Sequence, residues 1–192
     1  LSNDHVWVLD GTIHVGTGGQ ESVGQSNNSD QGGGSTLTID AGTMVMGAGG
    51  TKSSLRVTRG NDIAANGTAA QPVVFGAVDY DPDATEVTGD VADLSDRGQW
   101  GGVIVDGWAK VNTGDSNNQL QSEAAPAGDD NTWFGGTDDT DSSGSITYAV
   151  IAESGYALRP DEEVQGLTLE AVGSGTTINH SPSSGSKYRP SR

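Results

Sequence analysis

Cysteine is absent from the 192-residue chain, so no disulfide crosslinks the fold and no thiolate can serve as a nucleophile or zinc ligand. No apolar run is long enough to cross a bilayer, and we expect no membrane span. Basic residues are scarce, because nine Lys and Arg stand against 26 Asp and Glu, for a formal net charge of −17. This charge would repel a nucleic-acid backbone, so cations are expected as partners and nucleic acid is not.

Turn-forming residues dominate the composition. The chain has 30 glycines, and Asp, Asn, Ser and Thr are frequent, whereas residues that favour long helices are comparatively scarce. An all-β fold is therefore expected. Two short β runs, 5–9 and 12–16, meet at Asp10-Gly11 and predict an N-terminal β arm or cap. Residues 17–35 contain almost nothing apolar, which predicts a flexible Gly/Ser/Asn loop.

A strand-and-turn pattern recurs from Ser35 onward. Leu37, Leu55 and Val73 each stand in a short apolar run closed by a turn, and they are 18 residues apart at each step. That spacing is close to one circuit of a solenoid and predicts a short parallel β-helix. The shorter runs between these strands would supply a second strand in each coil. These runs, and then the further coils, are expected at 43–46 and 61–64, and at 100–105, 146–150, 167–169 and 176–178.

Two long acidic segments, 79–99 and 113–143, interrupt the pattern. Insertions of this kind project from one side of a repeat protein and usually carry its binding surface. Residues 181–192 form a polar tail that breaks the pattern, so we expect a single β-helix domain over 1–180. A solenoid that stops without a cap leaves apolar side chains and strand edges uncovered. A homo-oligomer that forms through the open coil end is therefore expected.

Several segments resemble a known family of bacterial secreted or lipid-anchored surface proteins, which fold as a right-handed parallel β-helix. The resemblance covers 35–180 and implies a secreted or cell-surface location, but it supplies no catalytic residues. Members usually continue beyond the point that matches His180, so the chain looks like a C-terminally truncated member. The segments that carry the resemblance are 59–75, 98–107 (GQWGGVIVDG), 145–148, 153–156 and 163–178.

A cluster of aspartates in the second acidic segment is the strongest chemical feature. Oxygen ligands on a flexible backbone are what Ca²⁺ prefers, although the spacing matches neither an EF-hand nor a calcium-binding β-roll. The alternative is a solvated acidic loop, and the same two readings apply to the acidic residues of 79–96. The candidate calcium ligands are Asp129, Asp130, Asp138, Asp139 and Asp141.

Three histidines provide an alternative metal site. His5, His14 and His180, or two of them with a carboxylate such as Asp10, would suit Zn²⁺ and leave a position for an activated water. These histidines come from opposite ends of the chain, so a folded-back arm or a dimer would have to bring them together. The alternative is that they are ordinary surface or strand histidines.

Two further features bear on a carbohydrate ligand. Trp133 and Phe134 lie in the acidic segment and would either pack or contact a ligand. A pair such as Asp106 with Asp115 could perform acid–base work on a glycosidic bond, but their separation cannot be read from the sequence. The arginines, Arg56 among them, are scattered along the chain and predict no basic groove for an acidic sugar.

Three functions follow from these features. The leading hypothesis is an extracellular structural or interaction module that binds divalent cations, Ca²⁺ foremost, through its acidic loops. The alternative is a small Zn²⁺-dependent hydrolase of esters or phosphoesters. A β-helix that binds or cleaves a carbohydrate comes third.

Overall fold

The computed structural model describes residues 1–19, 34–79, 97–125, 128–159 and 162–181. Every regular element in these ranges is a β-strand, and they contain no helix long and apolar enough to span a membrane. Three four-stranded parallel sheets form the body, and we name them A, B and C. Sheet A contains β1 (Val6–Leu9), β4 (Met44–Gly47), β7 (Val73–Ala77) and β12 (Ala149–Ile151). Sheet B contains β2 (Thr12–Val15), β5 (Ser54–Val57), β8 (Gly102–Asp106) and β15 (Leu167–Glu170), and sheet C contains β3 (Thr36–Ile39), β6 (Asp62–Asn66), β11 (Gly144–Thr147) and β16 (Thr177–Asn179).

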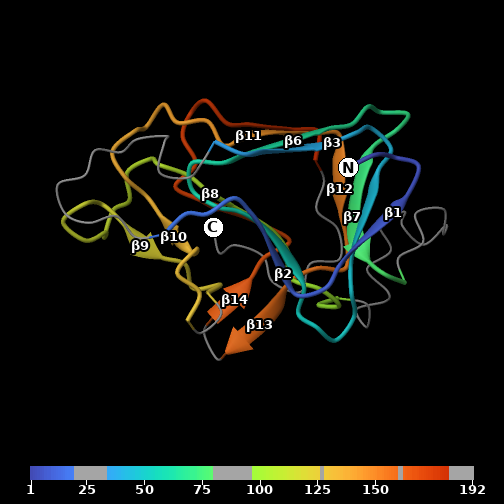
Figure 1. Cartoon of the computed structure of the whole chain (residues 1–192), viewed down its shortest axis with the longest axis horizontal. Coiled ribbons are helices and arrows are strands. Elements are labelled where there is room, and N and C mark those ends of the chain that lie inside the picture. The colour runs from blue at the N-terminus through green and yellow to red at the C-terminus, as the bar shows by residue number, and fades with distance from the viewer. Residues whose placement is uncertain (20–33, 80–96, 126–127, 160–161, 182–192) are drawn as a thin grey trace.

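The chain visits sheets A, B and C in turn and then returns to sheet A one layer further along. Strands β1, β2 and β3 form the first coil, and β4, β5 and β6 form the second. The third coil consists of β7, β8 and β11, and the fourth of β12, β15 and β16. Figure 1 shows the three sheets as the sides of a prism. The predicted all-β parallel β-helix is therefore confirmed, and β1 and β2 are two sides of its first coil.

The predicted length of one coil is wrong. Leu37 lies beside Ile63 in sheet C, and Val45 lies beside Phe75 in sheet A, so a circuit is longer than 18 residues. The spacing from Leu37 to Leu55 instead advances the chain by two strands, from sheet C to sheet B. Each coil therefore has three strands rather than two, because the chain turns at a third corner that the apolar pattern does not mark.

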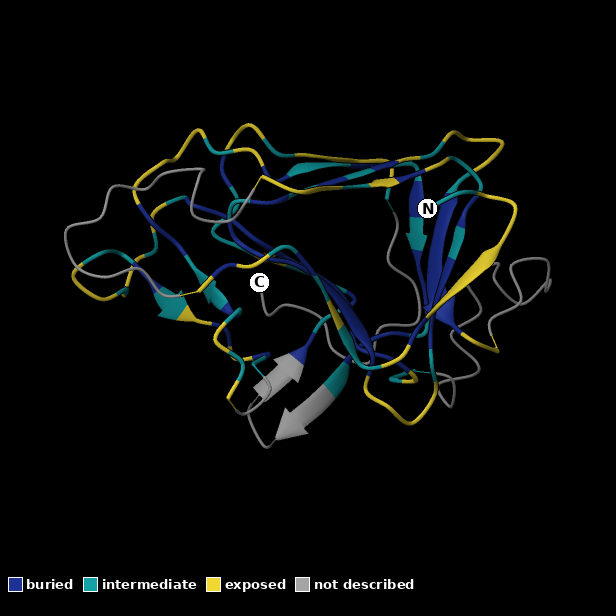
Figure 2. Cartoon of the chain, in the orientation of Figure 1, coloured by how far each residue is buried: buried dark blue, intermediate teal, exposed yellow. Residues whose placement is uncertain are grey.

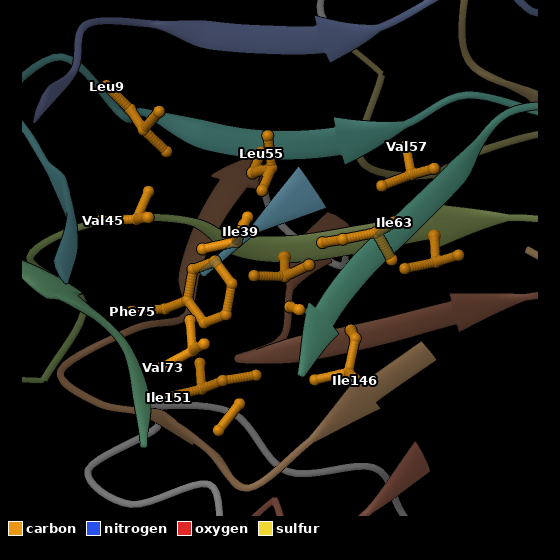
Figure 3. Packing of buried hydrophobic residues seen from close by; sticks show 14 of the residues in the cluster. Leu9, Ile39, Val45, Leu55, Val57, Ile63, Val73, Phe75, Ile146 and Ile151 are labelled. Atoms are coloured by element: carbon orange, nitrogen blue, oxygen red, sulfur yellow. The ribbon is translucent and has the colours of Figure 1, made fainter. Parts of the chain in front are cut away.

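Apolar side chains that point inward stack into ladders along the axis. Leu55 lies beside Val103 in sheet B, and Val45, Phe75 and Ile151 are successive neighbours in sheet A. All five are at most 1% exposed, and Figure 3 shows them facing the common interior. Burying each such side chain contributes about 1.5–3 kcal/mol. Packing between coils thus supplies the stability that disulfides supply in other small β domains.

The connections at the three corners of the coils differ in length. Connections from sheet C to sheet A are short, and Tyr148 alone joins β11 to β12 with a φ of 47°. The long connections, at the two corners that flank sheet B, comprise residues 16–35, 78–101, 107–143 and 152–166. We call residues 107–143 the B insertion. It contains the antiparallel pair β9 (Leu120–Gln121) and β10 (Trp133–Phe134), and residues 152–166 contain the antiparallel pair β13 (Tyr156–Arg159) and β14 (Glu162–Val164).

The predicted flexible segment 17–35 is closed at its base by Asn61. The Asn61 side-chain amide donates to the Thr17 carbonyl oxygen, and its Oδ1 accepts from the Ser35 backbone N–H. The middle of that segment, most of the acidic segment 79–99 and nearly all of the polar tail lie outside the described residues.

Candidate functional site

The outer face of sheet B brings charged side chains together. Side chains of a strand alternate between its two faces, so Arg56 points outward between two core residues of β5. The register places Arg56 beside His14 of β2 and places Asp106 of β8 beside Glu170 of β15. Three neighbouring strands therefore present Arg56, Asp106 and Glu170 on one side of the sheet.

Arg56 is the centre of this cluster. Its Nη1 lies 2.9 Å from Oδ2 of Asp106 and 3.6 Å from Oε2 of Glu170. Its Nη2 donates to Oγ of Ser122 at 2.8 Å and to the Ala124 carbonyl oxygen at 3.3 Å. The side chains of Arg56 and Asp106 are 0% exposed. One guanidinium thus pairs with two carboxylates and also holds the B insertion against the sheet.

The two carboxyl groups are close neighbours, and the side chain of Asp106 is fully buried whereas that of Glu170 is 12% exposed. Ser122 Oγ donates to Oε1 of Glu170 at 2.7 Å, while Oδ1 of Asp106 and Oε2 of Glu170 are buried and accept no hydrogen bond from a described residue. Burial raises the pKa of Asp106 well above its ordinary value, Arg56 lowers it, and the nearby Glu170 raises it further. Asp106 and Glu170 are near enough to share a hydrogen bond if one of them is protonated.

A small apolar cluster covers the charged groups. Ile104 of β8 packs with Ala124 of the B insertion and with Val164 and Tyr156, which are cross-strand partners at one end of the β13–β14 pair. The Tyr156 hydroxyl donates to the Lys52 carbonyl oxygen at 2.7 Å, and burial raises the pKa of Tyr156 to about 12. Segments from both corners that flank sheet B therefore meet over its outer face.

Arg59 forms a second attachment for the B insertion. Its guanidinium carbon lies 4.1 Å from the centre of the Trp108 ring, in cation–π geometry. Its Nη1 donates to the Gly135 carbonyl oxygen and its Nη2 to that of Gly19, both at 2.7 Å. Arg59 thereby ties the two ends of the B insertion to the segment that follows β2.

A third attachment joins His14 to Asp129. Nε2 of His14 lies 2.9 Å from Oδ2 of Asp129, and both side chains are half-buried. The other carboxylate oxygen of Asp129 accepts from the Asn131 backbone N–H at 2.9 Å. Asp129 therefore closes a turn of the B insertion and also contacts sheet B.

The predicted calcium ligands occupy two separate turns of the B insertion, 128–131 and 138–141. Asp138 accepts hydrogen bonds from the backbone N–H and hydroxyl of Thr140, which lower the pKa of Asp138. Asp139 accepts from the backbone N–H of Lys110, and its carboxylate lies 3.0 Å from the Lys110 ammonium; both contacts lower the pKa of Asp139. These two carboxylates are already engaged in holding a turn.

Asp141 and Asp130 complete the predicted set. Asp141 accepts from the Trp108 backbone N–H at 3.0 Å, and burial raises the pKa of Asp141. Asp130 is exposed in the 128–131 turn. In the described part of the chain, no three His, Asp or Glu side chains are arranged as a group that could hold a metal ion.

The histidines proposed for zinc lie on three different sheets. His5 precedes β1 of sheet A, His14 is in β2 of sheet B, and His180 follows β16 in the last coil of sheet C. His180 stacks on Tyr148 with ring centres 4.5 Å apart. Asp10 is exposed at the corner between β1 and β2. The structure thus brings one of these histidines, His14, to the charged face of sheet B and leaves the other two elsewhere.

Trp133 and Phe134 form strand β10 of the B insertion. Trp133 pairs with Gln121 and Phe134 with Leu120, and both aromatic side chains are half-buried. Their proposed contact with a ligand stays a prediction.

The suggested pairing of Asp106 with Asp115 stays a prediction. Asp115 accepts from the backbone N–H groups of Asn117 and Gln119 and so closes a turn. The carboxylate beside Asp106 belongs to Glu170, which the sequence did not single out. Both share one signal, since a charged residue follows an apolar one at the end of a sheet B strand.

The comparisons with known proteins agree with the fold. A family model described as a pectate-lyase-like β-helix domain matches residues 30–186. Neither the curated proteins nor the solved structures contain a significant match. The matched range includes strands of all four coils and the whole charged cluster on sheet B. The chain therefore belongs to the family of pectate-lyase-like β-helix domains.

Proposed function

We propose that the chain is an extracellular structural and interaction module rather than a hydrolase. The cover over sheet B is the observation that best supports this proposal. Arg56 and Asp106 are shut off from water, and Arg56 bonds to groups of the chain itself. A groove that receives a substrate would need this face to be open. The cluster therefore serves to hold the B insertion, and partners would bind elsewhere.

The two ends of the coil stack are the surfaces that best fit a partner. Trp7 and Ile13 of the first coil are 36% and 40% exposed, and Leu169 and Ile178 of the last coil are 42% and 37% exposed. These four residues continue the inward-facing ladders of sheets A, B and C. The first coil of one copy can therefore stack on the last coil of a second copy with all strands parallel. Such a head-to-tail contact would produce a homo-oligomer.

Loose binding of divalent cations is the second part of the proposal. Asp130 and Asp138 are exposed on the B insertion, and the chain carries a formal net charge of −17. Carboxylate oxygens on turns are suitable ligands for Ca²⁺. Calcium would then bind at the surface, without a catalytic role.

Light scattering after size-exclusion chromatography tests the head-to-tail contact. The molar mass of the wild type should rise with protein concentration, and Leu169→Asp should remain a monomer. Val78→Asp is the matched control, because Val78 is an exposed hydrophobic residue on the side of the stack, and it should behave as the wild type. A wild type that stays monomeric at every concentration contradicts self-association.

A panel of ester, phosphoester and oligosaccharide substrates tests the absence of catalysis. We expect no turnover with or without calcium. Turnover that a chelator abolishes would instead support the zinc hydrolase, and turnover of an oligosaccharide would support the carbohydrate-cleaving alternative.

A further inference from the structure

Two buried carboxylate oxygens on sheet B have no hydrogen-bond donor in the described part of the chain. They are Oδ1 of Asp106 and Oε2 of Glu170. The other oxygen of each carboxylate is satisfied, by Arg56 Nη1 for Asp106 and by Ser122 Oγ for Glu170. A buried acceptor without a donor costs about 1–3 kcal/mol, and more when it is charged. A proton shared between the two carboxyl groups would give both of these oxygens a hydrogen-bond partner.

We propose that Asp106 and Glu170 share one proton while the B insertion covers sheet B, and that release of this proton loosens the insertion. The proton comes from solvent, binds one carboxyl group and is donated to the other in a hydrogen bond. The pair then carries one negative charge, which the single positive charge of Arg56 balances. This inference is independent of the function proposed above.

The charge balance favours the shared proton. Among the described residues, Arg56 is the cation in contact with the pair, at 2.9 Å from Asp106 and 3.6 Å from Glu170. With both carboxylates ionised, the cluster would hold a net negative charge where Asp106 is 0% and Glu170 only 12% exposed, which is costly. The raised pKa of Asp106 agrees with this arrangement.

The cluster is linked to the B insertion through Ser122 and Ala124. Ser122 Oγ accepts from Arg56 and from the Ala124 backbone N–H while it donates to Glu170. If the insertion lifts, Glu170 loses this donor and water reaches both carboxyl groups. Ionisation of the pair and opening of the insertion therefore favour each other.

Other titratable side chains lie on the elements packed against the cluster. On the neighbouring strand β2, His14 contacts Asp129 of the B insertion at 2.9 Å. From the β13–β14 pair, Tyr156 stays neutral near neutral pH because burial raises its pKa to about 12. Tyr156 therefore adds no charge beside the pair at this pH.

The sign of the effect follows from linkage. The pKa of Asp106 is higher in the folded protein than in an unfolded chain, so the closed state binds the extra proton. The stabilisation is present at low pH and is lost as the pH rises through the raised pKa of Asp106. The insertion is thus held most firmly in mildly acidic solution.

Infrared spectroscopy tests the shared proton directly. At about pH 6, roughly two units above the ordinary pKa of Asp and Glu, the wild type should retain the carbonyl stretch of one protonated carboxylic acid. The difference spectrum against Glu170→Gln should contain that band, and the difference spectrum against Asp130→Asn, an exposed aspartate of the same insertion, should not. Absence of the band in the wild type at this pH overturns the proposal, whether or not the variants fold.

Hydrogen exchange tests the link to the insertion. After correction for the intrinsic effect of pH, exchange in peptides of 107–125 should increase on the order of tenfold between about pH 6 and about pH 8, because one proton is linked to opening. Glu170→Gln should remove most of this increase, because Asp106 then has no second carboxyl group with which to share a proton. Asp106→Asn serves as the second variant if Glu170→Gln does not fold, and Asp130→Asn should match the wild type. If the increase in exchange with pH is unchanged in Glu170→Gln and Asp106→Asn, the proposal is overturned.

Discussion

The outer faces of sheets B and C differ although both sheets line the same core. Strands β5 and β8 of sheet B are buried at every position, whereas β6 of sheet C alternates between buried and more exposed residues (Figure 2). On the outer side of sheet C, Asn66 Oδ1 accepts from the hydroxyl groups of Ser145 and Thr147, and water reaches these groups. The outer side of sheet B carries charges that pair beneath the chain's own insertions. Charge on a strand is therefore compatible with burial when insertions supply the partners.

Replacement of Arg56 by methionine should cause the largest loss of stability on the outer face of sheet B. Arg56→Met leaves Asp106 and Glu170 buried together without a cation, so the free energy of unfolding should fall by about 3–5 kcal/mol. Urea unfolding at about pH 7 measures this loss. A loss below about 1 kcal/mol would mean that the cluster is not closed in solution.

Removal of the charges of Arg56, Asp106 and Glu170 together tests whether the loss comes from unpaired charge. The triple variant Arg56→Met, Asp106→Leu, Glu170→Met makes the outer face of sheet B apolar, like the interior. Because no unpaired charge remains, its stability should recover most of the loss seen with Arg56→Met alone. A triple variant as unstable as the single one would show that the arginine acts by packing rather than by charge.

Tyr156→Phe should have a smaller effect. The change removes the hydrogen bond to the Lys52 carbonyl oxygen and should cost about 1 kcal/mol in urea unfolding. The wild type should also lose stability in alkali, because a tyrosine whose pKa rises from 10.0 to about 12 on folding stabilises the protein below pH 10 and ceases to do so by pH 12. Comparison of unfolding at about pH 9 and about pH 12 in wild type and variant measures this contribution. An equal alkaline loss in Tyr156→Phe would assign it to other groups.

Ser145→Ala on sheet C should have the smallest effect. Its hydroxyl donates to Asn66 at 2.9 Å on a face that water reaches, so solvent can replace it and stability should change by no more than about 0.5 kcal/mol. Thermal unfolding measures the change. A loss as large as that of Tyr156→Phe would remove the distinction between the two faces.

The fold class was easier to predict from the sequence than the number of strands in each coil. Short apolar runs bounded by turns located the strands, because alternation and turn residues are local properties of the sequence. The run 146–150 appeared to be one strand, yet Tyr148 adopts a φ of 47° and divides it between sheets C and A. A corner made by one non-glycine residue leaves no turn signal, so the division of this run into two strands was missed.

The site was less predictable because its members are far apart in sequence. Arg56, Asp106 and Glu170 meet through the register of three strands separated by insertions of unequal length. Their spacing therefore carries no period, and Arg56 appeared to be one of several scattered arginines. The local signal was present nonetheless, since each residue is a charge beside apolar strand positions, and a buried strand tolerates such a charge when it is paired.

The connection between β11 and β12 at Tyr148 cannot change in length, whereas the connections beside sheet B can. One residue added at Tyr148 would shift β12 by one position and turn its inward side chains outward. The corners beside sheet B already carry connections of very different length while the ladders remain in register. Those two corners are therefore the places where a foreign peptide or a new loop could be grafted. The segments that cover sheet B could be redesigned there while the three parallel sheets keep their register.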